Sequence, residues 1–88
     1  MARRYTLFVG TRDDYNDYNW LEAIETWAQR SRHKLEWMVD KSEDKYTARI
    51  SIDGNLVSHV IGTGNNLRSA RIKLIQELDR SEPAILTI

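Results

Sequence analysis

Apolar side chains recur at helical spacing in two parts of the chain. The first runs from Trp20 to about Arg32, and the second from Leu67 to Asp79. The stripe of the first comprises Trp20, Leu21, Ile24, Trp27 and Ala28, and that of the second Leu67, Ala70, Leu74, Ile75 and Leu78. Asn19, with Glu22 three residues later, is a suitable N-cap for the first helix, and Asn65 or Asn66 for the second. We therefore predict two amphipathic helices whose stripes lie in the core.

Between the helices, apolar and polar residues alternate, which predicts three strands. They span Lys34 to Asp40, Tyr46 to Ile52 and about Asn55 to Ile61. Residues 41–44 are polar and predict a short turn, and Asp53-Gly54 predicts a type I′ hairpin. A sheet with one apolar face needs cover, which the two helices provide. The predicted class is α+β, an α-β-β-β-α two-layer domain with both helices on one face of an antiparallel sheet.

The predicted domain occupies residues 19–79, with extensions at 1–18 and 80–88. Arg4 to Val9 and Ala84 to Ile88 are apolar and β-prone, so each extension predicts a short strand, while residues 11–19 predict a polar loop. Isolated strands leave backbone groups unpaired. The two segments would therefore pair with each other, extend the sheet, or pair across a two-fold axis in a homodimer.

Size and composition restrict the function without assigning it. The chain has 88 residues and no cysteine, which indicates one domain without disulfides or thiolate sites. Its 13 basic and 13 acidic residues give a formal net charge of zero. No segment has the apolar length of a membrane span, and the start lacks the apolar core of a signal peptide. We therefore expect an intracellular protein, cytoplasmic or nuclear, with no membrane partner.

Three separated segments are similar to motifs of the double-stranded RNA-binding domain. Residues 24–30 (IETWAQR) resemble the first-helix pattern, and residues 46–54 (YTARISIDG) the aromatic-led strand with its glycine turn. Residues 62–71 (GTGNNLRSAR) resemble the G-x-G-x-S-K-K-x-A-K signature. The resemblance extends from Asn19 to Leu78 and identifies the chain as an atypical member, with the α-β-β-β-α fold as the expected structure.

The resemblance implies a module that contacts duplex RNA through three regions. At the start of the second helix, Asn65, Asn66, Arg68 and Arg71 would contact phosphate, whereas Leu67 replaces the first lysine of the signature. Glu22, Glu25 and Thr26 would form the minor-groove face of the first helix. Lys41 and Lys45 flank the first turn, which lacks the family's G-P-x-H pattern. Binding is therefore expected to be weak or atypical.

Other chemistry has little support in the sequence. His33 and His59 have no metal-ligand spacing around them, and Asp13, Asp14 and Asp17 lack the glycine and further ligands of a calcium loop. We expect no enzyme activity, no cofactor and no metal. Two alternatives to RNA binding remain open: a protein-interaction or homodimerisation module on the same fold, and an accessory domain of a larger RNA-processing protein similar to ribonuclease III.

Overall fold

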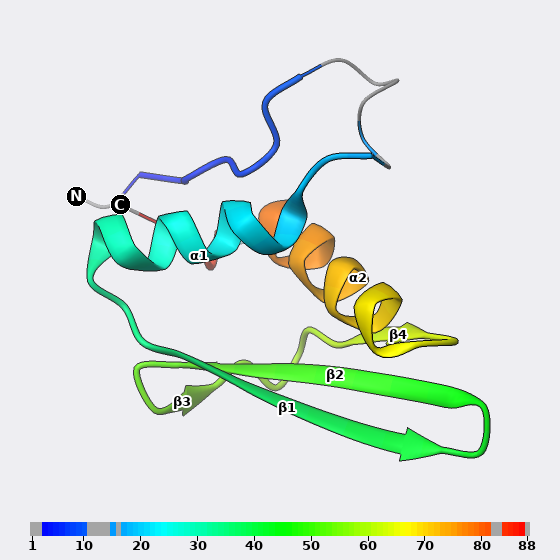
Figure 1. The fold of residues 1–88 in the computed structure, drawn as a ribbon. Helices are drawn as coiled ribbons and strands as arrows, with labels where there is room; N and C mark the ends of the chain where they lie inside the picture. The colour runs from blue at the N-terminus through cyan, green and yellow to red at the C-terminus, as the bar shows by residue number, and fades with distance from the viewer. Residues whose placement is uncertain (1–2, 11–14, 16, 82–83, 88) are drawn as a thin grey trace.

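The computed structural model describes residues 3–10, 15, 17–81 and 84–87, and its elements follow the predicted order (Figure 1). These are α1 (Trp20–Ser31), β1 (Leu35–Ser42), β2 (Lys45–Ile52), β3 (Asn55–Leu56), β4 (Gly62–Gly64) and α2 (Leu67–Asp79). Both helices lie on one face of the antiparallel sheet (Figure 1). The α+β class and the α-β-β-β-α layout are therefore confirmed.

The helices begin at the predicted caps. The Asn19 side chain accepts the Glu22 N–H at 3.2 Å and donates to the Glu22 carboxylate at 2.8 Å. Asn66 caps α2 by accepting the Ser69 N–H at 2.8 Å, so the second of the two candidates is the cap. Arg32 ends α1 in the left-handed region at φ 57°. These side-chain bonds satisfy N–H groups that a helix leaves free in its first turn.

The first hairpin is tighter than predicted. β1 pairs with β2 over its whole length, from Leu35 opposite Ile52 to Ser42 opposite Lys45. The turn is therefore only Glu43-Asp44, and the predicted four-residue turn is wrong because residues 41 and 42 continue the strand ladder. Glu43 takes a φ of 53° to make this two-residue connection. In the second hairpin Asp53 (φ 54°) and Gly54 (φ 84°) are both positive, as predicted.

The third strand is interrupted, and the prediction of a continuous strand over residues 55–61 is wrong. β3 pairs with β2 at Ser51 and Ile52, and β4 pairs with β2 at residues 46–48. Between these two pairings, residues 49 and 50 of β2 lie opposite the five residues 57–61, which form an irregular segment. Val60 is buried while Leu56 and Ile61 are about half exposed, a spacing that fits a bulge and not a strand. His59 consequently lies in a turn, not in a strand as predicted.

The core lies between the helices and the sheet. Its largest fully buried side chains are Trp20, Ile24, Trp27, Ile50, Leu74, Ile75, Leu78 and Leu86. Six of these belong to the helices, so the prediction that the helical stripes form the core is confirmed there; Ile50 comes from β2 and Leu86 from the C-terminal segment. Leu67 is an exception, with 38% of its surface exposed. As the first residue of α2 it lies one turn before Ala70, at the rim of the packed layer.

The terminal segments pair with each other on the side of the helices away from the sheet (Figure 1). Arg4 and Thr87 form one antiparallel bridge, and the Tyr5 N–H donates to the Leu86 carbonyl at 2.9 Å. Beyond this bridge the described residues of the two predicted segments form no strand, because side chains bond the backbone of Leu7. The Asp79 carboxylate accepts the Leu7 N–H at 2.6 Å, and the Tyr18 hydroxyl donates to the Leu7 carbonyl at 2.6 Å. Ile88, Thr11 to Asp14 and Asn16, from the predicted strand and loop, lie outside the described residues.

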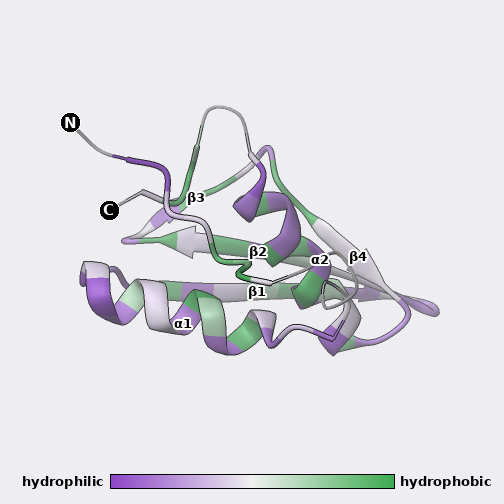
Figure 2. Cartoon of the chain, turned by 90° about the horizontal axis from the view of Figure 1, so that it is seen from above, coloured by the Kyte–Doolittle hydropathy of each residue, from purple (hydrophilic) through white to green (hydrophobic). Residues whose placement is uncertain are grey.

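These segments add to the same core. Leu7 and Leu86 are 3% and 1% exposed, and the Trp27 indole N–H donates to the Thr87 carbonyl at 3.0 Å. Phe8 lies within 5.1–5.6 Å of the rings of Tyr18 and Trp20, measured between centroids. The extensions thus form a third layer that covers the tryptophan-rich side of α1, whereas the tip of the β1–β2 hairpin is hydrophilic (Figure 2).

Candidate nucleic-acid interface

Two glycines bring the start of α2 against β4. An ideal Cβ on Gly62 would lie 2.1 Å from the Ala70 carbonyl oxygen and 2.4 Å from the Leu74 nitrogen. On Gly64 it would lie 2.7 Å from the Ser69 Cβ. Both positions therefore exclude a side chain, and this is the structural reason for the G-x-G spacing. The contact fixes where the first turn of α2 presents its N–H groups.

The predicted phosphate ligands at this helix start differ in their surroundings. Asn65 and Arg68 are exposed, while the Asn66 side chain is occupied by its capping bond. Arg71 is half-buried, with its guanidinium carbon 5.2 Å from the centre of the Trp37 ring. Its Nε is buried and has no hydrogen-bond partner within the described ranges. Arg71 therefore packs on the sheet, whereas Arg68 is exposed.

The hairpin tip lies beside the start of α2. A groove of about 510 Å³ is lined by residues 42–45 of the hairpin together with Thr63, Gly64, Asn65 and Lys73. The structure thus brings two predicted residues, Lys45 and Asn65, to one surface. Lys41 lies over the ring of its strand partner Tyr46, 5.5 Å from the centroid, and Tyr46 pairs in turn with Gly64. Lys73 was missed by the sequence reasoning, since its spacing from Arg71 shows no motif.

Basic side chains gather at one end of the domain even though the chain has a formal net charge of zero. Around the start of α2 and the hairpin tip lie five cations, namely Lys41, Lys45, Arg68, Arg71 and Lys73. The carboxylates at the tip are Glu43 and Asp44. Asp40 bonds Arg49 at 3.2 Å, and both side chains belong to the sheet. This end of the domain, which we call the basic end, therefore favours an anionic partner.

The predicted minor-groove face of α1 is a separate surface. Leu21, Glu22, Glu25, Thr26 and Gln29 line a shallow groove of about 460 Å³ on this helix. Glu22 is engaged by Asn19, and Thr26 is half-buried where the N-terminal segment crosses α1. None of the described cations of the basic end lines this groove. The three regions predicted to bind RNA are thus present but do not form one continuous basic surface.

Another groove separates α1 from β1. It has a volume of about 260 Å³ and is lined by Glu25, Ala28, Gln29, His33, Leu35 and Trp37. The His33 ring stacks on Trp27 with centroids 4.9 Å apart, and its Nδ1 lies 2.5 Å from an Asp53 carboxylate oxygen. The backbone N–H of Lys34 and, after it, His33 lower the pKa of Asp53. The edge strand β1 is thereby tied to the turn of the second hairpin.

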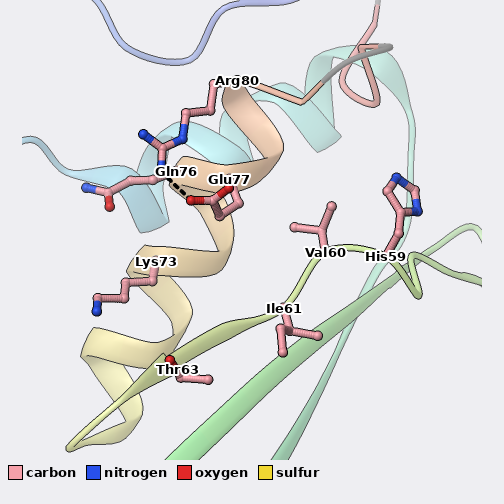
Figure 3. A pocket seen from close by; sticks show the side chains of 8 residues that line it. All are labelled: His59, Val60, Ile61, Thr63, Lys73, Gln76, Glu77 and Arg80. Carbon is pink, nitrogen blue, oxygen red and sulfur yellow. Dashed lines mark hydrogen bonds and ion pairs between the residues drawn. The ribbon is translucent and has the colours of Figure 1, made fainter.

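A further hollow lies between α2 and the segment that leads into β4. It measures about 410 Å³ and is lined by residues 59–61, by Thr63 of β4, by α2 and by its C-cap Arg80 (Figure 3). Arg80 is paired with Glu77, and the His59 ring points away from Lys73 and Glu77 (Figure 3). Among the described residues, no group of three or more His, Cys, Asp or Glu side chains is placed to hold a metal ion. In the same part of the chain, no helix has the length and apolarity to cross a membrane.

Comparison with known proteins gives no assignment: no family model, no curated protein and no solved structure matches the chain.

Proposed function

We propose that this domain binds double-stranded RNA through the basic end, and that it belongs to the double-stranded RNA-binding family as an atypical member. The observation that carries the proposal is the gathering of five cations at the start of α2 and the adjacent hairpin tip of a neutral chain. Free N–H groups and the helix dipole add to the attraction of this end for phosphate. An RNA-binding role agrees with an intracellular location.

The tight first hairpin makes the expected binding weak. A two-residue turn of Glu43 and Asp44 presents carboxylates where a longer loop would enter a minor groove. Affinity must then come mainly from phosphate contacts, which depend on salt. If about four cations each contact one phosphate, log K falls with log salt at a slope of about −3 to −4.

Charge reversal at the exposed Arg68 tests this proposal. Fluorescence anisotropy with a labelled duplex RNA of about 16 base pairs, the length that such domains span, measures the affinity at several salt concentrations. Arg68→Glu should weaken binding at least about tenfold and make the salt slope shallower by about 1. Arg30→Glu is the matched control, since Arg30 is exposed in the last turn of α1, away from the basic end. Equal losses in both variants would contradict a phosphate site at the start of α2.

Protein binding at the same end is the second candidate. Leu67 and Val39 are 38% and 36% exposed, and Leu67 stands where the resembling signature has a lysine. Duplex RNA offers phosphates and not apolar groups to such side chains. The argument for a homodimer through the terminal strands was that these segments would be unpaired. It no longer applies, because they pair with each other within one chain. A domain that shows no affinity for the duplex at low salt would support the protein-binding role.

A further inference from the structure

The groove between α1 and β1 contains the accessible tryptophan of this chain. Trp20 and Trp27 are each 1% exposed, whereas Trp37 is half-buried and lines the groove. The Arg71 guanidinium lies over the indole, 5.2 Å from the centre of the Trp37 ring. Aromatic rings and arginine planes are the surfaces on which proteins stack unpaired nucleic-acid bases.

The volume of the groove restricts its occupant. At about 260 Å³ it is smaller than the pockets of roughly 300–1,000 Å³ that take drug-sized ligands. It therefore admits one small ring system, and not a longer ligand. Leu35 and Ala28 supply apolar contacts inside it, and the polar side chains come from the last two turns of α1 and from His33.

The polar groups of the groove fit a base better than a phosphate. Glu25 and Gln29 are one helical turn apart and both line it. A carboxylate repels phosphate, which makes Glu25 a poor residue for a backbone-reading face. It is a good acceptor for the two adjacent N–H donors on the Watson–Crick edge of guanine, and adenine has no such pair. The Gln29 amide offers both a donor and an acceptor beside it.

We infer that the α1–β1 groove binds one unpaired guanine of an RNA strand whose phosphates lie on the basic end. The base stacks on the part of Trp37 that lines the groove, which Arg71 does not line, and its Watson–Crick edge meets Glu25 and Gln29. Arg71 connects the two surfaces, since it packs on Trp37 and belongs to the basic end. This inference rests on the proposed function and adds a specificity to it: a duplex with an unpaired guanine is preferred over a fully paired one.

Three RNA probes test the preference by fluorescence anisotropy: a 16-base-pair duplex, the same duplex with one bulged guanine, and the same duplex with one bulged adenine. The wild-type chain should bind the guanine bulge about fivefold or more tighter than the other two. Glu25→Gln should reduce this ratio below about twofold. Glu36→Gln is the control. Glu36 is an exposed carboxylate on β1, the strand that contributes Trp37 to the groove, but it does not line the groove itself.

The outcomes separate the two proposals. Equal affinity of the wild-type chain for all three RNAs would overturn the base site and leave the proposed function intact, with an apolar peptide side chain as the better occupant. If no RNA binds, the proposed function fails. A titration with guanosine 5′-monophosphate then tests whether the groove binds the base. NMR shifts of the Trp37 indole N–H and the Gln29 side-chain amide would then support the base site, and their absence at millimolar nucleotide would refute it.

Discussion

Gly62→Ala should be the most destabilising small substitution in the β4–α2 contact. The added Cβ would lie 2.1 Å from the Ala70 oxygen, 2.4 Å from the Leu74 nitrogen and 2.8 Å from the Leu74 Cβ. Two of these three neighbours are backbone atoms of a helix, and neither can rotate away. Restoring ordinary van der Waals contact requires α2 to move from β4 by about 1 Å, in an interior packed at crystal-like density.

The magnitude follows from the cost of overpacking. Inserted methyl groups in packed interiors cost about 1–3 kcal/mol, and a backbone clash places this substitution at the upper end, about 3 kcal/mol. A chain of this length has a total stability of roughly 4–13 kcal/mol at 0.05–0.15 kcal/mol per residue. In a domain of this size each kcal/mol shifts the melting temperature by about 4–8 °C. The expected loss is therefore about 12–24 °C.

Thermal unfolding followed by far-UV circular dichroism measures this loss. Gly54→Asn is the matched control, because a Cβ at Gly54 meets nothing within 4 Å and asparagine tolerates its φ of 84°. The control should melt within about 8 °C of the wild-type chain. A Gly62→Ala variant that melts within about 4 °C of wild type would refute the reasoning that this glycine sets the distance between β4 and α2.

Three further perturbations test other contacts. Asp79→Ala removes the acceptor of the Leu7 N–H and should cost about 2 kcal/mol, measured by urea unfolding, with faster hydrogen exchange at Leu7; unchanged exchange would show that this bond does not hold the N-terminal segment. The folded-state pKa of Asp53 is lowered, so its ionised form adds stability above its ordinary pKa of 3.8 and that stability is lost as the pH falls through the lowered value. The melting temperature of Asp53→Asn should therefore decrease less below about pH 4 than that of the wild-type chain. The same decrease in both chains would contradict the link between Asp53 ionisation and stability. Arg71→Ala should expose the Trp37 ring and increase its quenching by acrylamide, whereas unchanged quenching would show that the guanidinium does not cover the indole.

The parts of the fold that the sequence predicted well rest on local chemistry. Asn19 and Asn66 cap the helices through side-chain bonds to residues three positions later. The Asp53-Gly54 turn follows from the backbone freedom of two adjacent residues. The tryptophan core follows from helical periodicity, which a window of a dozen residues already contains.

The parts that it missed depend on contacts between distant residues. The third strand breaks because the glycines of β4 must meet α2 while Val60 enters the core, and alternation alone does not show this competition. The terminal segments pair through one bridge and not along whole strands, because Asp79 and Tyr18 bond the backbone of Leu7. In the candidate site, Arg68 is exposed at the predicted helix start, but the packing of Arg71 on Trp37 joins residues 34 positions apart in the chain. Hydrophobic periodicity describes residues within one helix or strand and does not predict a contact between two of them.

The central claim is that the basic end binds duplex RNA, and an NMR titration of the ¹⁵N-labelled chain with a duplex of about 16 base pairs at low salt tests it most directly. We predict shifts in the backbone amides of residues 64–71 and 41–46 that diminish as salt is added, together with the Trp37 indole signal if the RNA carries an unpaired guanine. No shifts at high micromolar RNA, or shifts confined to the sheet face that bears Met38 and Leu56, would contradict the account.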